Sequence, residues 1–391
     1  MASRAYLDHA ATTPMLDQAR EAWLDNSRHS GNPSSLHASG RAARRIVEES
    51  RESIAAALGV RPSAVIFTSG GTEADNLAIK GLFWKRRDSI IGTPVIVASP
   101  IEHHAVLDPL HWLAEHEGAE ISWLPVDSLG RVNAADVSAA IEAAGGRVAL
   151  VTVMWANNEI GTVQPVHEIA AVCRMAGVPF HTDAVQALGS LPLDLEGIDA
   201  VTITGHKIGG PFGVGALIAE TNLGLVPVQH GGGQEREVRS GTLDAPGIAA
   251  FAVAVQHAVA HQAASAERLR ALRDRMITGV RAAAPSAVLN GDPVDRLPGN
   301  AHFSFAGCEG DALLMLLDAA GVDVSTGSAC SAGIPEPSHV LLALGVDERA
   351  ARGSLRFSLG RTSTDDDVDA LLAALPAAVE RASRAGSAAR R

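Results

Sequence analysis

Two polar clusters in the middle of the chain carry residue types that could do chemistry together. The first covers residues 181–186 (His-Thr-Asp-Ala-Val-Gln) and the second covers residues 204–207 (Thr-Gly-His-Lys). Apolar, β-prone residues precede each cluster, so each is predicted to begin where a buried parallel strand ends. Ligands bind at the carboxyl ends of strands in open α/β sheets. We therefore expect Asp183 and Lys207 to share one rim of a cleft.

A carboxylate and an amine on one rim suit pyridoxal phosphate. This cofactor needs a lysine that holds its aldehyde as a Schiff base, and an acid that keeps its pyridinium nitrogen protonated so that the ring can accept electrons. A surface ion pair is the alternative for an Asp and a Lys this close in sequence. The buried strand ends, the glycines and the histidines at 181 and 206 favour the chemical interpretation.

The overall composition is that of a globular enzyme. Of the 391 residues, 47% are hydrophobic and 19% are charged. The formal net charge of −12 argues against a general nucleic-acid-binding surface, so no direct contact with nucleic acid is expected. Residues 1–8 contain no apolar signal segment, and no apolar run approaches the roughly 20 residues that span a bilayer. We expect a cytoplasmic protein without a membrane segment.

Cysteine usage argues against two kinds of site. Cys173, Cys308 and Cys330 are widely separated and show no CxxC spacing. Neither a disulfide framework nor a zinc site is expected from this pattern, and no other metal site is predicted. One of the three could be a reactive thiol.

The start of the chain is predicted to be helical. Thr13 as N-cap with Pro14 at the first helical position is a helix-start signal, and we expect a helix from about residue 14 to residue 25. A polar turn at residues 31–37, which includes Asn32, precedes an amphipathic helix at residues 40–58.

A glycine-rich turn at residues 69–73 follows a predicted strand and opens a helix. Glycines let the backbone approach an anion, the helix N-terminus offers free N–H groups, and Thr72 adds a hydroxyl beside Gly71. The turn could therefore cradle a phosphate. A plain connection between strand and helix is the alternative.

Two further predicted strands also end in polar residues. The strand at residues 95–98 leads to His103, which could stack on a planar cofactor or could be a polar residue at the start of the next helix. The strand at residues 148–154 leads to a segment that contains Asn158. Repeated strand-then-helix units predict a parallel sheet with right-handed crossovers.

The last third of the chain predicts a smaller unit. A long Ala-rich helical region at about residues 246–283 looks like a connector. Shorter strands and helices follow it, with a loop of small residues at 325–333 that contains Cys330. We expect an α/β fold with a large domain at 15–260, built on a mostly parallel central sheet, and a smaller α/β domain made of 1–14 and 261–391.

Taken together, these segments resemble a known family. The sequence looks like a cysteine desulfurase of the pyridoxal-phosphate fold-type I superfamily, a class V aminotransferase-like transferase of the group I type, whose cysteine sits in a long loop. The resemblance covers nearly the whole chain. The motifs that carry it are Leu7-Asp8 with residues 10–14, residues 31–35 with His37, residues 71–73 with Asn76, Glu102-His103, residues 157–161, His181 with Asp183 and Gln186, residues 205–207, residues 231–236 with 239–242, residues 327–330, and Arg356 with residues 358–361.

The resemblance implies a role for each site residue. Lys207 would hold the cofactor aldehyde and move the α-proton, Asp183 would bind the pyridinium nitrogen, and His103 would stack on the ring. Arg356 would clamp the substrate carboxylate, a task suited to a planar guanidinium. The implied set is completed by cofactor contacts from Gly71, Thr72, Asn158, Gln186, Thr204 and His206, by Thr242 from a second subunit of a homodimer, and by substrate contacts from Asn158 and Asn32.

Cys330 is the residue that names the implied reaction. Its thiolate would attack the sulfur of L-cysteine held on the cofactor, leaving alanine and a persulfide. A sulfur-acceptor protein, either a scaffold or a sulfurtransferase, would take up this sulfur for iron–sulfur cluster assembly or for thiolation of tRNA or DNA. For Cys173 and Cys308 we favour the role of small buried hydrophobes.

Two other kinds of function fit much of the same pattern. Another fold-type I enzyme, such as a selenocysteine lyase or an aminotransferase, would keep Lys207 and Asp183 but would not need Cys330. A non-catalytic sulfur-carrier scaffold that kept the fold would lack the visible absorbance of the bound cofactor.

Overall fold

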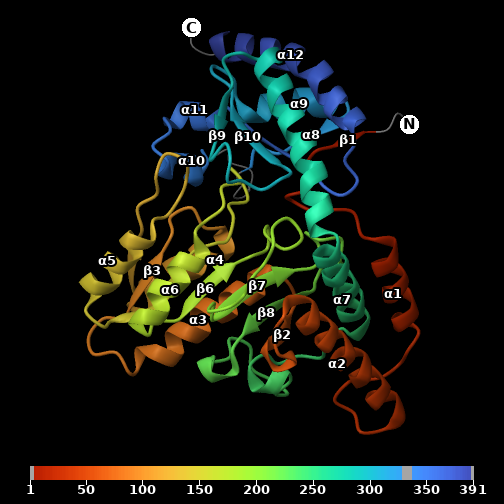
Figure 1. The fold of residues 1–391 in the computed structure, drawn as a ribbon, viewed down its shortest axis with the longest axis vertical. Helices are drawn as coiled ribbons and strands as arrows, with labels where there is room; N and C mark the ends of the chain where they lie inside the picture. Colours follow the sequence, from red (N-terminus) through yellow and green to blue (C-terminus); the bar gives the residue numbers. More distant parts are fainter. Residues whose placement is uncertain (1–3, 328–336, 389–391) are drawn as a thin grey trace.

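The computed structural model describes residues 4–327 and 337–388. Within these residues the chain forms one sheet of seven strands and two smaller sheets, with helices packed on their faces (Figure 1). Cys330 belongs to residues 328–336, which lie outside the described residues. No helix in the described part is long and apolar enough to cross a membrane.

The large sheet has a mostly parallel core. Its strands, in their order across the sheet, are β2 (Val65–Thr68), β8 (Gly215–Ala219), β7 (Ala200–Thr204), β6 (Phe180–Asp183), β5 (Val148–Thr152), β3 (Val95–Ala98) and β4 (Glu120–Trp123). The five strands from β7 to β4 pair in parallel, whereas β8 is antiparallel to both of its neighbours. The prediction of a mostly parallel central sheet is therefore confirmed.

Helices cover both faces of this sheet. One face packs against α2 (Ala38–Leu58), α5 (Ala134–Ala144), α6 (Val166–Ala176) and α7 (Ala245–Ala260), and the other packs against α3 (Gly71–Arg87) and α4 (His104–Glu117). Strand side chains alternate between the two cores: Val65 and Phe67 belong to the first, and Ile66 belongs to the second. Coverage on both faces explains why these strands are nearly continuous apolar runs.

The remaining elements surround a separate core. β1 (Ala5–Tyr6) pairs in parallel with β11 (Val322–Asp323), and β12 (Ser354–Ser358), β10 (Asn300–Ser304) and β9 (Val288–Asn290) form an antiparallel sheet in that order. α8 (Gln262–Ala283), α9 (Gly310–Ala319) and α12 (Asp365–Ala388) pack against these strands, as the upper part of Figure 1 shows. The division into 15–260 on one side and 1–14 with 261–391 on the other stays a prediction, which the separate cores support.

Two predicted helix boundaries are wrong. α1 (Asp17–Ser27) begins after Pro14, because the backbone N–H groups of Thr13 and Leu16 donate to the carbonyls of His206 and Gly209. The stretch before α1 is thereby tied to the loop after β7 instead of starting a helix. The Ala-rich connector is also two helices, α7 and α8, since the backbone at His261 (φ −106°, ψ 4°) leaves the helical region. This break lets each helix pack on its own core.

A buried ion pair fixes residues 231–242, a segment that carries Thr242. Arg51 on α2 donates to the two carboxylate oxygens of Glu235 at 2.6 and 2.9 Å, and the backbone N–H of Phe67 donates to the same carboxylate at 2.8 Å. The side chains of Arg51 and Glu235 are only 4% and 1% exposed. Glu235 and the next two residues have positive φ angles of 47°, 57° and 67°, which residues other than glycine rarely adopt. The ion pair thus holds a strained turn in place.

Replacing Glu235 with alanine should lower the free energy of unfolding by about 3–5 kcal/mol, because the Arg51 guanidinium would be left buried without its partner. Urea denaturation of the purified variant measures this loss. The matched control is Glu48→Ala, since Glu48 bonds the same arginine but its side chain is 50% exposed. That variant should lose less than about 1 kcal/mol. Equal losses in the two variants would contradict this account of the segment.

Candidate active site

The two polar clusters lie side by side at one edge of the large sheet. β6 ends at Asp183, β7 ends at Thr204, and the strand register pairs Asp183 with Thr202. Parallel strands have their carboxyl ends at the same edge, and Lys207 follows directly after β7. The expected cleft therefore forms where these two strands end.

A cleft of about 360 Å³ opens at this edge and has the size of a small-molecule site. It gathers most of the residues that the sequence singled out. Asn32 and Thr242 do not line it, and both are exposed. The side chain of Asn32 accepts a bond from the Ser34 N–H, and the substrate contact expected of it stays a prediction. The predicted residues that line the cleft are Gly71, Thr72, His103, Asn158, Asp183, Gln186, Thr204, His206, Lys207 and Arg356.

The Lys207 amine is held against the N-terminal segment. Its Nζ donates to the carbonyls of Ala10 at 2.6 Å and Ala11 at 2.7 Å. Burial lowers the pKa of Lys207 to about 8, and the positive charge of Arg356 adds to the shift. A much larger share of this amine than of an exposed lysine is therefore neutral, and so nucleophilic, near neutral pH.

Asp183 belongs to a cluster of buried acids. Burial raises its pKa to about 8, with a further contribution from the charge of Asp75. Burial also raises the pKa of Asp75 to about 7 and raises that of Glu102 well above its ordinary value. A cation beside Asp183 would relieve the cost of burying its negative charge. This end of the cleft therefore favours a positively charged group of a ligand.

His103 starts a helix and also lines the cleft. It is the N-cap of α4, where its Nδ1 accepts a hydrogen bond from the Ala105 N–H at 3.1 Å, and its ring lines the cleft. Burial lowers its pKa to about 4, with the charge of Lys207 adding to the effect. The imidazole is thus neutral and is fixed in orientation by its capping bond.

The turn before α3 forms an anion cradle. No side chain of the described residues caps this helix, so the N–H groups of its first turn stay available to a ligand. A Cβ atom at Gly71 would lie 3.0 Å from Cγ2 of Val185, which leaves little room for a larger residue. The side chains of Thr204 and His206 meet beside it, with Oγ1 and Nδ1 3.3 Å apart. Phosphate recognition fits this end of the cleft.

Arg356 reaches the cleft from β12 of the three-stranded sheet. Its guanidinium donates to the carboxylate of Asp8 at 2.7 Å and to the carbonyl of Asn158 at 3.0 Å. Its Nε is buried and has no hydrogen-bond partner among the described residues. These two bonds use two of the five guanidinium N–H donors, so three have no bond to the described residues and remain for a carboxylate of a ligand.

The described residues on either side of 328–336 reach the same place. Ser325 exchanges backbone hydrogen bonds with Arg356, at 2.7 and 3.3 Å. Ser325 and Gly327 on one flank, and His339 beyond the other flank, all line the cleft. Both described flanks of residues 328–336 thus reach the cleft, although Cys330 itself lies outside the described residues.

The other two cysteines are poor candidates for a nucleophile. Cys173 and Cys308 are 0% and 3% exposed. Burial raises the pKa of Cys173 to about 12 and raises that of Cys308 as well. Both thiols are therefore protonated and shielded, as favoured from the sequence.

Sequence reasoning gave no role to the acids that surround the predicted residues, although Glu102 belongs to one of the quoted motifs. Asp75 lines the cleft, and Glu102 accepts a bond from the Met154 N–H at 2.7 Å from a wholly buried position. The neighbouring His181 is also wholly buried and does not line the cleft; its ring nitrogens contact the hydroxyls of Thr152 and Thr202. Asp75 follows the glycine-rich turn by only a few residues, and Glu102 precedes His103 directly. Their position next to predicted site residues was thus the sequence signal that could have identified these two acids. No group of three or more potential metal ligands occurs within residues 4–327 and 337–388.

Comparison with known proteins identifies the family. The family described as Aminotransferase class-V matches residues 5–371. The chain belongs to the class-V aminotransferase family. It is 57% identical over 389 residues to an IscS-like cysteine desulfurase of Mycobacterium tuberculosis (strain ATCC 25618 / H37Rv), covering 98% of both chains. It is 43% identical over 379 residues to the cysteine desulfurase IscS of Methanosarcina thermophila, covering 96% of this chain and 92% of that one.

Solved structures in this family have the same fold. A NifS-like protein matches with a TM-score of 0.89 and 34% identity, over 97% of this chain and 100% of that one. A structure titled "SspA in complex with cysteine" matches with a TM-score of 0.78 and 35% identity, over 92% of this chain and 100% of that one. The predicted fold-type I architecture is therefore confirmed.

Pyridoxal phosphate is the cofactor of this class-V family member, and the cleft fits it. The buried Asp183 carboxyl suits the cationic ring nitrogen, and the partly neutral Lys207 amine suits the aldehyde. The turn at Gly71, with its helix N-terminus, suits the phosphate. The residues that would hold the cofactor are Gly71, Thr72, His103, Asn158, Asp183, Gln186, Thr204, His206 and Lys207.

The Lys207 amine of the apo-protein should react with acetic anhydride along a pH profile that has its midpoint near 8. The midpoint should move to higher pH in Arg356→Gln, because removing a neighbouring positive charge makes the protonated lysine less unfavourable. Mass spectrometry of the Lys207 peptide measures the reaction, with the Lys85 peptide of the same digest as the reference for reagent activity.

Arg384→Gln is the matched control, since this arginine is exposed on α12 and is not among the charges that act on Lys207. Its Lys207 profile should match that of the unchanged protein. A midpoint near the ordinary lysine value of 10.5 would contradict this description of the site.

Proposed function

We propose that the chain is a pyridoxal-phosphate-dependent L-cysteine desulfurase, a sulfurtransferase that takes sulfur from L-cysteine and leaves L-alanine. Relatives at 57% and 43% identity are named cysteine desulfurases, and one similar structure is titled as a complex with cysteine. The observation that carries the proposal is that Lys207, Arg356 and both described flanks of the Cys330 segment meet in one cleft.

Lys207 and Asp183 serve the cofactor end of the reaction. Pyridoxal phosphate supplies, when bound, an electron sink for chemistry at the α-carbon of an amino acid. The Lys207 amine would bind the aldehyde and carry the α-proton. The Asp183 carboxyl would hold the proton of the ring nitrogen. His103, oriented by its bond to Ala105, would pack against the ring.

Arg356 serves the substrate end. Its guanidinium binds the carboxylate of L-cysteine, while the bonds to Asp8 and to the Asn158 carbonyl keep it oriented towards the cleft. β12 of the three-stranded sheet supplies this arginine, and the loop after β7 of the large sheet supplies Lys207. The substrate is therefore held between the large sheet and the three-stranded sheet.

Cys330 takes the sulfur. A bond forms between its Sγ and the sulfur atom of the substrate while the carbon–sulfur bond of the substrate breaks. The electron pair of the broken bond stays with the carbon, which is then protonated, so alanine leaves and the extra sulfur remains on Cys330 as a persulfide. No outside oxidant or reductant is needed for this step. A cytoplasmic location belongs to the proposal, because that compartment keeps thiols such as Cys330 reduced.

Two partners follow from this function. The exposed position of Thr242, outside the cleft of its own chain, supports its delivery to the cleft of a second copy, and hence a homodimer. A sulfur-acceptor protein then removes the persulfide. Iron–sulfur cluster assembly and thiolation of tRNA or DNA can all use such a persulfide, so the acceptor decides the pathway.

Cys330→Ala should reduce alanine formation from L-cysteine at least 100-fold, because the variant has no thiol that can take the sulfur. Loss of one positioned catalytic side chain costs about 10²–10⁴ in rate. The holoenzyme is incubated with L-cysteine and a reductant, and alanine and sulfide are measured. The unchanged protein should also gain one sulfur atom on the Cys330 peptide, as seen by mass spectrometry before reduction.

Cys173→Ala is the matched control and should keep both activities, since its thiol is buried and protonated. Full sulfide release by Cys330→Ala would refute the desulfurase mechanism. Persistence of selenide release from selenocysteine in that variant, with loss of sulfide release, would identify a lyase activity that does not depend on the thiol.

A further inference from the structure

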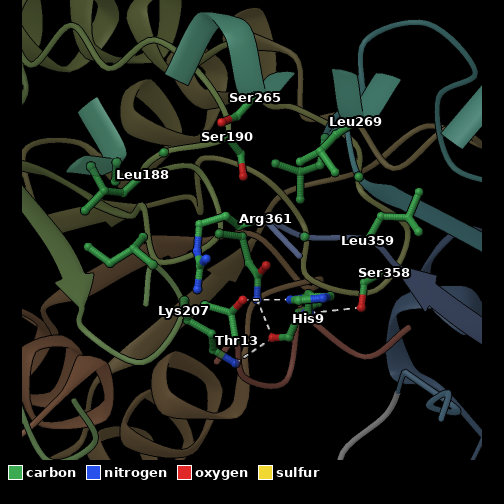
Figure 2. A pocket seen from close by; sticks show the side chains of 18 of the residues that line it. His9, Thr13, Leu188, Ser190, Lys207, Ser265, Leu269, Ser358, Leu359 and Arg361 are labelled. Carbon is green, nitrogen blue, oxygen red and sulfur yellow. Dashed lines mark hydrogen bonds between the residues drawn. The ribbon is translucent and has the colours of Figure 1, made fainter. Parts of the chain in front are cut away.

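A second cavity lies next to the cofactor cleft, between the large sheet and the three-stranded sheet. Its volume is about 120 Å³, several times what one water molecule needs. The N-terminal segment around His9, the junction of α7 and α8, and residues 358–361 line it, and it opens to solvent where His261 and Arg361 are exposed. Figure 2 shows Arg361 between Lys207 and His9 on one side and Ser190 and Ser265 on the other.

This cavity and the cofactor cleft adjoin, since Ala10, Val185, Gln186 and Lys207 form a shared wall that lines both. The carbonyl of Ala10 accepts hydrogen bonds from Lys207 Nζ at 2.6 Å and from Gln186 Nε2 at 3.0 Å. The N–H of Ala10 donates to the Ser358 hydroxyl at 2.9 Å, and His9 Nδ1 lies 2.7 Å from the Thr13 hydroxyl. Asp183 and the anion cradle at Gly71 lie on the other side of this wall and do not line the cavity.

The lining of the cavity is basic. None of the described residues that line it is an aspartate or a glutamate. Burial lowers the pKa of His9 to about 4, with the charge of Arg361 adding to the shift and that of Asp367 opposing it, so this imidazole is neutral near pH 7. Burial also lowers the pKa of His257, on which the charge of Arg361 acts as well. The guanidinium of Arg361 is therefore the main source of positive charge in the described lining. The basic side chains that line the cavity are His9, Lys207, His257, His261 and Arg361.

A buried amide in the lining lacks partners. Asn300 is 2% exposed, and neither its Nδ2 nor its Oδ1 has a hydrogen-bond partner within the described part of the chain. Leaving such a group unpaired costs about 1–3 kcal/mol, so a buried amide is normally satisfied by protein, water or ligand. The Arg361 guanidinium donates one bond, to the Pro14 carbonyl at 3.2 Å, out of the five donors of its fork.

We propose that this cavity binds a small oxyanion, the phosphate, sulfate or carboxylate group of a small molecule, between Arg361, Asn300 and the histidines at 9, 257 and 261. The charge of Arg361, with no acid among the described residues of the lining, attracts an anion, and the unpaired amide and the guanidinium supply donors for its oxygens. The proposal does not rest on the desulfurase reaction, because none of these residues is assigned a part in it.

Isothermal titration of the holoenzyme tests the proposal. Bound pyridoxal phosphate fills the anion cradle at Gly71, so an added anion cannot be counted there. Inorganic phosphate, inorganic sulfate and malonate are titrated separately at constant ionic strength, which distinguishes the three oxyanion types. At least one should bind with a measurable affinity, and Arg361→Gln should weaken it about tenfold or more through loss of charge-assisted hydrogen bonds.

Two variants keep the test decisive. Arg384→Gln removes an exposed arginine from the outer part of α12 and should bind the anion as the unchanged protein does. Asn300→Leu should weaken binding while keeping the unfolding midpoint, because the amide has no bond to lose within residues 4–327 and 337–388. This variant decides the matter if Arg361→Gln fails to fold. The proposal is overturned if none of the three anions binds, or if the cavity variants bind the anion as tightly as Arg384→Gln.

Discussion

Burial of ionisable groups at the carboxyl edge of the large sheet is the constraint on which the rest of the structure depends. It brings the pKa of the Lys207 amine down to about 8 and the pKa of the Asp183 carboxyl up to about 8. An exposed amine and an exposed carboxyl would keep their ordinary values and would both be charged at neutral pH. The parallel strands β6 and β7 create this environment because helices cover both faces of the sheet. The same packing that gives the fold its core thus prepares the amine and the acid for the cofactor.

The N-terminal segment joins the large sheet and the three-stranded sheet at the site. The Leu7 carbonyl accepts a bond from the Ser358 N–H at 2.8 Å, the Asp8 carboxylate holds Arg356 at 2.7 Å, and the Ala10 carbonyl holds Lys207 at 2.6 Å. One short stretch therefore contacts both the arginine for the substrate and the lysine for the cofactor. This connection explains why residues at the start of the chain belong to a motif whose other members lie far along the sequence. It also makes the spacing between Arg356 and Lys207 sensitive to any change in this stretch.

The sequence was sufficient to predict the parallel sheet and most of the cleft, because each strand is an apolar run that ends in polar residues. Asp183, Thr204 and Lys207 could be placed in this way, since parallel strands end at a common edge. Asp75 and Glu102 could not, because their importance comes from burial between elements that no local pattern brings together. The late start of α1 and the break at His261 also depend on tertiary contacts that override local helix signals. Asn32 is exposed outside the cleft of its own chain, and Cys330 lies outside the described residues.

Identification of the lysine that captures the cofactor tests the central claim most directly. The lysines of the sequence are Lys80, Lys85 and Lys207, so the outcome is unambiguous. The apo-protein is incubated with pyridoxal phosphate near neutral pH and reduced with borohydride, and its peptides are analysed by mass spectrometry. The account predicts that the phosphopyridoxyl group is on Lys207 alone, because its amine is buried beside Asp183, whereas the Lys80 amine lies over the Trp112 ring. Labelling of Lys80 or Lys85 in place of Lys207, or an unlabelled Lys207, would contradict it.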